Sequence, residues 1–464
     1  MSRTPLPLPS TDDLRAALER VPARRVECAV GDFTSLARGK VVAASDFVGM
    51  AGCRLPSVVF GLTLTAGEPD AVFGPLLPED YADVRLVPDL ATLAPRPGRP
   101  GEATVICEPV GQLAVQGGEM SIQALSPRAA LRHVLAQFRA AGLQALAAPE
   151  LEMFLLKRTE HNGQVVLGAA EPYGHAGASE RVTEVLCLER ASHFDAYFDE
   201  LYAACEVLGI PMTGHAHESA LSQYEVNFAP GDPLAQADAV WRFKRLAREV
   251  ALRHGFMASF APKPFLDLPG TGMHWHFSVQ RPADATWPHV FATPAGEDSP
   301  ALHHFIAGLQ RHAPAAMALF APHDMAFDRI ALSDASPSHA SWGHEARSLA
   351  FRIPASGGSS RRIENRLPGG DANPYLTVAA TLGLGLLGLR EGALPVPGQP
   401  DALALPANLP HALNALAGSE ALRGLLGSPL VEALVAIKRH EHDERRLLAD
   451  PRQQWDMAYL LEAA

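Results

Sequence analysis

The pattern of apolar and polar positions changes character near residue 120. Residues 12–21 have apolar positions at helical spacing, and short β-type runs follow at 25–30, 40–44, 56–65, 84–90 and 102–110. Residues 126–143 begin with Ser-Pro and end with Gly-Leu, which predicts a helix, and helices and strands alternate from there to the end. The pattern therefore predicts two domains, a strand-rich unit over 1–120 and a larger mixed unit over 121–464.

Composition and charge narrow the class of partner. The chain has 464 residues, of which 47% are hydrophobic and 19% charged, as in an ordinary globular protein. Its formal net charge is −12, and the sequence contains no block of Lys and Arg. Nucleic acid and anionic membranes both favour clustered basic residues, so neither is expected as the main partner. A small-molecule substrate fits this balance better.

Cysteine usage and apolar runs bear on the compartment. Five scattered cysteines, with no CxxC pair, make a disulfide framework improbable and favour a reducing environment. The N-terminal residues have no apolar core of signal-peptide type, and the longest apolar run, 375–389, is too short to span a bilayer. We therefore expect a soluble, cytoplasmic protein without membrane association.

Two short motifs suggest a ligand but have simpler explanations. Gly383, Gly385 and Gly388 form a GxGxxG pattern, yet they follow a segment of helical rather than strand character, so close helix packing is the better interpretation. The run HEHDE at 440–444 ends an amphipathic helix without HExxH spacing. It predicts a solvated helix face rather than a metal site.

A pair of carboxylates carries the first sign of chemistry. Glu150 and Glu152 are two apart in an apolar, strand-like run, and side chains at i and i+2 share one face of a strand. Two acids on one buried face require a cation. The alternative is a half-exposed strand with its polar residues outward, but Leu151, Met153 and Phe154 leave no clean alternation.

Further acids and histidines extend this set. Glu218 and Glu225 bracket a loop, and His274 and His276 share one face of a predicted strand. Glu364 adds a fifth carboxylate within an arginine-rich segment. Five glutamates with one or two histidines form a hard, oxygen-rich ligand set, which favours Mg²⁺ or Mn²⁺ over zinc or copper. These ions commonly accompany ATP.

Arginines crowd into the same part of the chain. Guanidinium groups bind phosphate and carboxylate through paired hydrogen bonds and stabilise the charge that develops in phosphoryl transfer. Single surface arginines are common, so each alone decides little. Together with the carboxylates they favour phosphate chemistry: the fewer than forty residues concerned contain Arg329, Arg347, Arg352, Arg362 and Arg366.

At these residues the sequence resembles the glutamine synthetase superfamily. Seven motifs occur in the family's order and extend over nearly the whole chain: ARGK at 37–40, VRLVPDL at 84–90, PELEMF at 149–154, HESALSQYEVNF at 217–228, GTGMHWHFS at 270–278, RSLAFRIP at 347–354 and RRIENRLPGGDANPYL at 361–376. The resemblance implies an α+β fold, with an N-terminal β-grasp domain and a catalytic domain built on a curved antiparallel sheet. It also implies a homo-oligomer, a ring-stacked dodecamer with active sites between neighbouring subunits.

The resemblance assigns the ligands of two metal ions by motif. One ion is expected to bind Glu152, Glu218 and Glu225. The other ion, which bridges the ATP phosphates, is expected to bind Glu150, His274 and Glu364. The cofactors implied are thus ATP and Mg²⁺ or Mn²⁺.

The same resemblance assigns the substrate contacts. His276, Ser278 and Arg362 match nucleotide-contacting positions. The expected reaction phosphorylates the side-chain carboxylate of glutamate, and an amine then attacks the γ-glutamyl phosphate. Arg329, Arg347 and Glu364 are the expected catalytic residues, with Arg347 steadying the acyl phosphate, and the positions that hold glutamate and the transferred phosphate are Gly270, Arg329 and Arg366.

Departures from the family pattern bear on the amine. Ammonia-using members have an aspartate that binds ammonium and a flap glutamate that removes its proton. Those positions correspond here to Thr63 and Ala335, so both acids are missing from the expected amine site, although Asp334 lies one residue from the flap position. Without such an anionic pocket an organic amine becomes the more plausible nucleophile. Pro269 also stands where the family usually has asparagine.

The sequence therefore predicts an ATP-dependent carbon–nitrogen ligase that joins glutamate to an organic amine, with a role in amine or polyamine catabolism and nitrogen metabolism. The spacing of Glu218 and Glu225 and the Trp342-Gly343 pair resemble the γ-glutamylpolyamine and glutamate–putrescine ligase branch. Three alternatives remain: an ammonia-dependent glutamine synthetase, a non-catalytic scaffold that keeps the fold, and an enzyme with another acyl donor.

Overall fold

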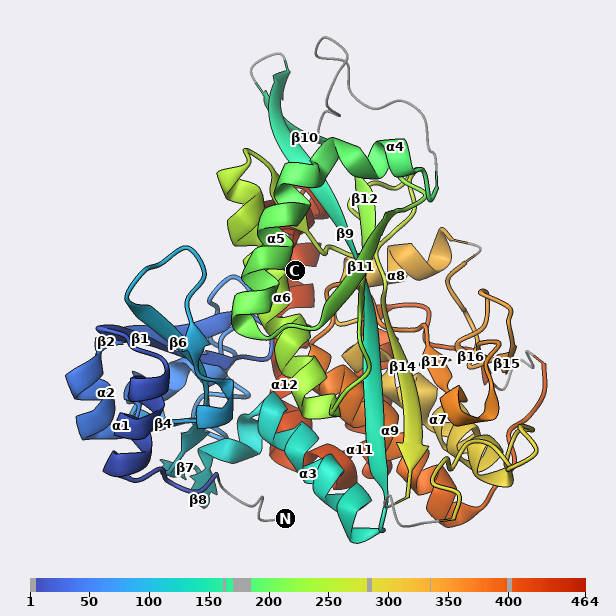
Figure 1. Cartoon of the computed structure of the whole chain (residues 1–464), viewed down its shortest axis with the longest axis horizontal. Coiled ribbons are helices and arrows are strands. Elements are labelled where there is room, and N and C mark those ends of the chain that lie inside the picture. Colours follow the sequence, from blue (N-terminus) through green and yellow to red (C-terminus); the bar gives the residue numbers. More distant parts are fainter. Residues whose placement is uncertain (1–5, 162–163, 170–184, 282–285, 334, 399–402) are drawn as a thin grey trace.

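The computed structural model describes residues 6–161, 164–169, 185–281, 286–333, 335–398 and 403–464 (Figure 1). The N-terminal part is built on a mixed sheet with strand order β2-β1-β6-β4-β3, in which β1 and β6 are parallel and the other neighbours antiparallel. Its elements are α1 (Thr11–Arg20), β1 (Arg25–Gly31), β2 (Ala37–Ala43), α2 (Ala44–Met50), β3 (Cys53–Pro56), β4 (Asp83–Pro88), β5 (Ala94–Pro95) and β6 (Glu102–Val110), followed by the hairpin β7 (Gln112–Val115) and β8 (Gly118–Ser121).

The larger C-terminal part is built around a second sheet, with strand order β11-β12-β9-β14-β17-β16-β15, while β10 and β13 also pair with β9. Its strands are β9 (Gln144–His161), β10 (Gln164–Ala169), β11 (Met212–His217), β12 (Gln223–Phe228), β13 (Met257–Ser259), β14 (Met273–Gln280), β15 (Trp342–His344), β16 (Phe351–Ile353) and β17 (Ile363–Asn365). Its helices are α3 (Pro127–Ala140), α4 (Leu188–Ala191), α5 (Asp195–Leu208), α6 (Pro233–Arg253), α7 (Pro300–Phe320), α8 (Asp324–Ala331), α9 (Pro374–Glu391), α10 (Leu409–Ala417), α11 (Glu420–Leu426), α12 (Ser428–Arg446) and α13 (Leu461–Ala463), with a π-helical turn at Arg452–Leu460. The α+β fold is confirmed, and the division at residue 120 stays a prediction.

Local signals in the sequence explain two of the helix starts. Ser10 caps α1 by accepting from the Asp13 N–H, and the Asp13 carboxylate accepts from the Ser10 N–H in return. Ser126 caps α3 by accepting from the Ala129 N–H, and Pro127 occupies the first turn, where a missing N–H costs nothing. Both predicted helices are therefore confirmed to within a few residues.

The predicted strand over 56–65 is wrong for all but its first residue. β3 ends at Pro56, and a 3₁₀ turn follows over Ser57–Phe60. In the residues that follow, side chains accept from backbone N–H groups that a neighbouring strand would otherwise have bonded. Thr63 Oγ1 accepts from the Gly67 N–H at 2.7 Å, and Glu441 Oε1 accepts from the Leu64 N–H at 2.7 Å. The β-branched composition predicted a strand, but hydrogen bonds to α12 fix a turn.

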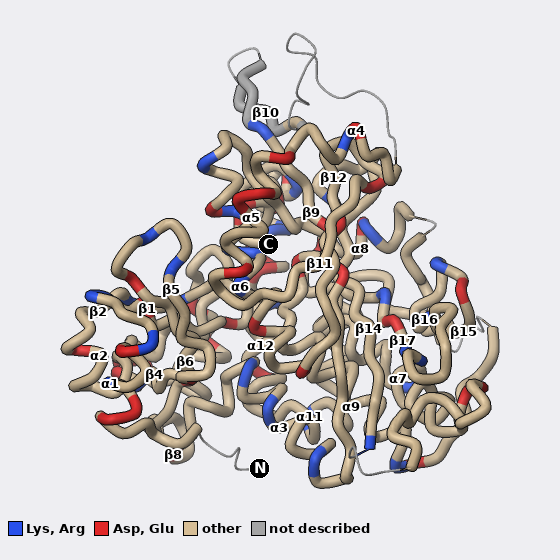
Figure 2. Tube along the Cα trace, viewed as in Figure 1, with Lys and Arg blue, Asp and Glu red and all other residues tan. Residues whose placement is uncertain are grey.

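Buried and partly buried ion pairs join the N-terminal sheet to the larger C-terminal part. Arg128 on α3 donates to both oxygens of Asp238 on α6 at 2.8 Å and to Glu108 on β6 at 2.9 Å. Arg245 on α6 makes a two-pronged bond to Glu27 on β1, with both distances 2.9 Å. Figure 2 shows Lys and Arg interspersed with Asp and Glu over both parts of the chain.

Helices α7 and α9 cross at close range behind the sheet. A Cβ added to Gly388 would lie 2.1 Å from the His304 carbonyl oxygen, and one added to Gly385 would lie 2.1 Å from the Phe305 ring. These contacts require glycine, which confirms that the GxGxxG pattern reflects helix packing. All five cysteines are free, as expected. Within the described ranges, no helix has the length and apolarity needed to cross a bilayer.

A chain of buried ionisable groups joins α12 to the turn after β17. His323 Nδ1 lies 2.7 Å from Asp371 Oδ2, His323 Nε2 lies 2.8 Å from Lys438 Nζ, and Lys438 Nζ donates to Glu441 Oε2 at 2.8 Å. We call Asp371, His323, Lys438 and Glu441 the buried relay, since each is at most 4% exposed. The predicted solvated face at 440–444 is therefore wrong for Glu441, which is buried by its long-range partners.

Candidate active site

Four neighbouring strands bring the predicted ligands onto one face of the large sheet. Glu150 on β9 pairs with His274 on β14, and Glu152 on β9 pairs with Glu225 on β12. His276 on β14 pairs with Glu364 on β17. Directly paired residues project to the same face of a sheet, as do residues two apart on one strand. Antiparallel register thus brings together side chains that are up to 214 positions apart in the chain.

Glu150 lies at the centre of this arrangement. Two groups have ligand atoms that all lie within 4.8 Å of one another: Glu150 with His276 and Glu364, and Glu150 with Glu225 and His274. His276 Nε2 lies 2.9 Å from Glu150 Oε1, and His274 Nδ1 lies 3.8 Å from Glu364 Oε1. These groupings differ from the division by motif, so the assignment of ligands to two separate ions stays a prediction.

Glu152 and Glu218 lie beside these groups. Glu152 Oε2 accepts from the Gly272 N–H at 2.8 Å, and Glu218 Oε2 accepts from the Ser219 N–H at 3.2 Å, in the loop that follows β11. Glu218 is close enough for its charge to act on Glu152. We refer to Glu150, Glu152, Glu218, Glu225 and Glu364 as the carboxylate cluster.

The electrostatics of the carboxylate cluster show an excess of negative charge. Burial and the charge of Glu218 raise the pKa of Glu152 to about 7, and burial and the charge of Glu150 raise the pKa of Glu225 to about 7. Burial also raises the pKa of Glu150, but the neighbouring His276 outweighs it, so the pKa of Glu150 is lowered overall. Two carboxylates titrating near neutrality indicate that the side chains present do not balance their charge.

The cluster fits a divalent cation. Burial and the nearby Arg366 and Arg329 lower the pKa of His274 well below its usual value, which keeps the imidazole neutral, as metal binding requires. Carboxylate oxygens dominate the set, with imidazole nitrogen as a minor donor. That chemistry suits Mg²⁺ or Mn²⁺, and a bound ion would neutralise the carboxylates whose charge is otherwise unbalanced.

Two arginines already contact the fully buried Glu364. Arg352 Nη1 donates to Glu364 Oε2 at 2.6 Å, and Arg366 Nη1 donates to Glu364 Oε1 at 2.5 Å. A cation at this carboxylate would share it with both guanidinium groups. Arg352 is one of the clustered arginines, but no role was predicted for it. Its contact with Glu364 follows from the strand register, because Arg352 on β16 pairs directly with Glu364 on β17.

Gly270, Arg329 and Arg366 lie close together, while their role in holding glutamate and phosphate stays a prediction. A Cβ on Gly270 would lie 2.3 Å from the Pro262 carbonyl oxygen and 2.9 Å from Arg329 Cγ, so only glycine fits. Arg329, buried on α8, donates to the Leu367 and Arg366 carbonyl oxygens at 3.1 and 3.3 Å. Arg366 Nε donates to the Arg347 carbonyl at 2.8 Å, which places the Arg347 backbone beside the same group.

A cavity of about 390 Å³ adjoins the carboxylate cluster. Its lining includes Glu150 together with all three predicted nucleotide positions, His276, Ser278 and Arg362. Arg362 Nε donates to His276 Nδ1 at 3.3 Å, and the other ring nitrogen, Nε2, lies 2.9 Å from Glu150 Oε1. The cavity lining therefore combines a carboxylate with polar and apolar side chains, and its volume suits a small ligand.

The two positions predicted for the amine have no described contact with the carboxylate cluster. Thr63 is buried in a turn against α12, where Thr65 Oγ1 donates to Glu444 Oε2 at 2.7 Å. Ala335 is exposed. Among the described contacts, neither residue touches the carboxylate cluster within one chain, and Asp334 lies outside the described residues.

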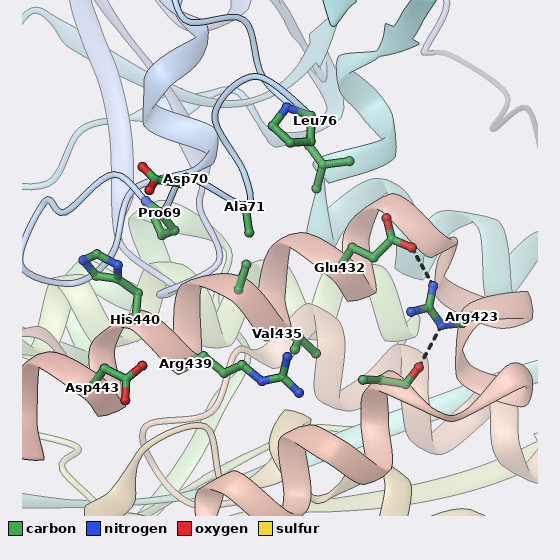
Figure 3. A pocket seen from close by; sticks show the side chains of 13 residues that line it. Pro69, Asp70, Ala71, Leu76, Arg423, Glu432, Val435, Arg439, His440 and Asp443 are labelled. Atoms are coloured by element: carbon green, nitrogen blue, oxygen red, sulfur yellow. Dashed lines mark hydrogen bonds and ion pairs between the residues drawn. The ribbon is translucent and has the colours of Figure 1, made fainter. Parts of the chain in front are cut away.

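A separate hollow of about 470 Å³ lies between residues 69–76 and α12 (Figure 3). Three of its charged residues have partners within the chain, because Arg423 Nη1 donates to Glu432 Oε1 at 2.7 Å and Arg439 Nη2 donates to Asn414 Oδ1 at 2.8 Å. The lining residues include no member of the carboxylate cluster. We assign it no ligand.

Comparison with known proteins agrees with this architecture. Residues 124–457 match the family model described as the catalytic domain of glutamine synthetase. The γ-glutamylputrescine synthetase of Escherichia coli is 29% identical, over 96% of this chain and 94% of that protein. A glutamine synthetase of Methanocaldococcus jannaschii is 32% identical, over 79% of this chain and 81% of that protein. A solved structure titled as a GmaS–ADP complex is 27% identical, with a TM-score of 0.77 over 95% of this chain and 99% of that one.

The family match and the named relatives together define a ligase. The matched residues make up well over half of the chain. The chain belongs to the glutamine synthetase family.

Proposed function

We propose that this protein is an ATP-dependent ligase that forms a γ-glutamyl amide from glutamate and an organic amine. The observation that carries the proposal is the carboxylate cluster, with two glutamates titrating near pH 7, next to a cavity lined by His276, Ser278 and Arg362. Such a face requires cations, and the adjoining cavity can hold the nucleotide whose phosphates those cations would bind.

In the proposed reaction, an oxygen of the glutamate side chain attacks the γ-phosphorus of ATP, forming an oxygen–phosphorus bond as the bond to ADP breaks. The amine nitrogen then attacks the acyl carbon, inorganic phosphate leaves, and the amine loses a proton. The carboxylate cluster would hold a divalent cation, which when bound would neutralise charge on the phosphoryl group. Arg347 and Arg366 stabilise the acyl phosphate through charge-assisted hydrogen bonds, and Arg329 orients the glutamate.

Two observations support an organic amine over ammonia. Thr63 and Ala335 stand where ammonia-using members carry acids, so the groups that would bind and deprotonate ammonium are absent from those positions. The similarity to a γ-glutamylputrescine synthetase over nearly the full length agrees with an organic amine. The dodecamer and the cytoplasmic location stay predictions.

Ammonia remains the second candidate, because a glutamine synthetase is also among the relatives at 32% identity and Asp334 is one residue from the flap position. A scaffold without chemistry is disfavoured, since it gains nothing from crowding five carboxylates on one partly buried face.

The test measures phosphate release with Mg²⁺, ATP and glutamate against ammonium, methylamine, ethanolamine, putrescine, spermidine, aniline and isopropylamine, and identifies the amide by mass. We expect at least one organic amine to exceed ammonium in kcat/KM by tenfold or more. Ammonium as the best substrate would make Asp334 the flap acid. ATP binding without turnover of any amine would overturn the ligase proposal.

A further inference from the structure

Gln223 is a buried amide side chain at the first residue of β12. It is only 1% exposed, and it lies two residues before Glu225, so both side chains project to the same face of the strand. No sequence motif assigns Gln223 a role. A fully buried amide beside a carboxylate cluster must find partners for its donors and its acceptor, since an unpaired buried polar group costs stability.

The Gln223 side chain joins three segments of the site. Its Nε2 donates to the Gly270 carbonyl at 2.8 Å and, over a longer 3.4 Å, to Glu152 Oε2. Its Oε1 accepts from the Ala220 N–H at 3.2 Å, in the loop between Glu218 and β12. One amide thus contacts the glutamate-binding position Gly270, the carboxylate Glu152 and the loop that carries Glu218.

These contacts fix the orientation of one carboxylate. Glu152 Oε2 receives the Gly272 N–H at 2.8 Å as well as the amide of Gln223. Two donors on Oε2 hold the plane of the carboxylate and leave Oε1 as the oxygen that can meet a cation. A glutamate at position 223 would add a like charge, and an apolar residue would leave Glu152 Oε2 with the Gly272 N–H as its one described donor and would release the Gly270 carbonyl.

We infer that Gln223 is a positioning residue that holds Glu152 and the Gly270–Gly272 segment in one geometry, so that the cation and glutamate bind to a preformed site. The inference rests on the proposed function for the identity of the glutamate position. Hydrogen bonds that orient metal ligands commonly affect metal affinity by tenfold or more when they are removed.

The experiment uses the full-length protein and Mn²⁺ alone as the probe, titrated by calorimetry. Gln223→Met keeps the volume and removes the donors, while Gln223→Glu keeps the shape and adds charge. Gln310→Met is the matched control, since that buried amide bonds the Ala340 and Val396 carbonyls away from the carboxylate cluster. We expect Mn²⁺ affinity to fall about tenfold in Gln223→Met and to stay within twofold in the control. Gln223→Glu should lose less affinity than Gln223→Met, because its added carboxylate also attracts the cation. The KM for glutamate should rise in parallel, with a smaller change in kcat.

Unchanged Mn²⁺ affinity in folded Gln223→Met overturns the inference, as does loss of the fold in both Gln223 variants, which would make the residue structural. An equal loss of affinity in Gln310→Met also overturns it. Wild-type protein that binds Mn²⁺ yet turns over no amine refutes the proposed function alone. In that case the Mn²⁺ affinities still decide the role of Gln223.

Discussion

The carboxylate cluster and the buried relay both place ionisable groups inside the catalytic domain, but they balance charge differently. In the buried relay each group contacts the next along a continuous chain, with Lys438 2.8 Å from Glu441 and His323 2.7 Å from Asp371. In the carboxylate cluster, burial and like charge raise the pKa of Glu152 and of Glu225 to about 7.

The difference separates a structural group from a binding group. Charges buried with partners of opposite sign hold elements together and need nothing from outside the chain. Charges of one sign crowded on a face destabilise the fold unless a ligand neutralises them, and such crowding is typical of functional sites. Substitution in the relay should therefore cost stability, and substitution in the cluster should cost activity.

The largest effect is expected from Lys438→Met, which tests the structural half of this comparison. Removing the ammonium leaves the Glu441 carboxylate and the second nitrogen of His323 buried without their partner. We expect the free energy of unfolding to fall by about 3–5 kcal/mol, as measured by urea denaturation. The matched control on the same helix is Arg446→Ala, which removes an exposed pair with Asp443 and should cost less than about 1 kcal/mol. Equal losses in the two variants would contradict the structural assignment of the relay.

Glu152→Gln tests the other half. Loss of one carboxylate that would meet a cation should reduce kcat/KM at least about a hundredfold, which corresponds to roughly 3 kcal/mol of transition-state stabilisation. The unfolding free energy measured in EDTA should stay the same or rise by about 1 kcal/mol, because a carboxylate repelled by Glu218 is gone. Glu432→Gln, which alters an exposed pair with Arg423, provides the control for activity. A large loss of stability in Glu152→Gln would place this residue with the relay.

The two regions also differ in how far the sequence could predict them. The carboxylate cluster was predictable, because spacing of two within a strand-like run places Glu150 with Glu152 and His274 with His276 on one face. Which strands are neighbours does not follow from spacing, so the direct pairing of Glu150 with His274 and of Arg352 with Glu364 needed the structure.

The buried relay was not predictable from local pattern. Glu441 and Lys438 lie near the end of a helix whose many charged residues predict an exposed surface. Their partner His323 is 115 positions from Lys438 in the chain. The turn at 63–67 was predicted as a strand for the same reason, since the side chain that accepts from the Leu64 N–H belongs to Glu441, 377 residues away. Periodicity reports burial within one element, whereas these contacts depend on which distant element packs against it.

Lys244 on α6 is an intermediate case between the two regions. It is fully enclosed beside the relay, and its Nζ donates to the Ala372 carbonyl at 3.2 Å and lies 5.7 Å from the centre of the Phe260 ring. Burial and the charge of Arg248 lower the pKa of Lys244 to about 7, against the opposing effect of Asp371. The positive charge of Lys244 is therefore offset only in part by the negative charge of Asp371.

Lys244→Met should therefore stabilise the fold, and by an amount that depends on pH. Between the folded-state pKa of about 7 and the ordinary value of 10.5, the unfolded chain binds a proton that the folded chain does not. The wild-type protein consequently gains stability as pH rises through this window, whereas the methionine variant lacks this gain. We expect the advantage of the variant in urea denaturation to be about 2 kcal/mol larger at pH 7 than at pH 9. An advantage that is the same at pH 7 and pH 9 would mean that Lys244 keeps its proton in the folded protein. The charge of Asp371 would then stabilise Lys244 as well as His323.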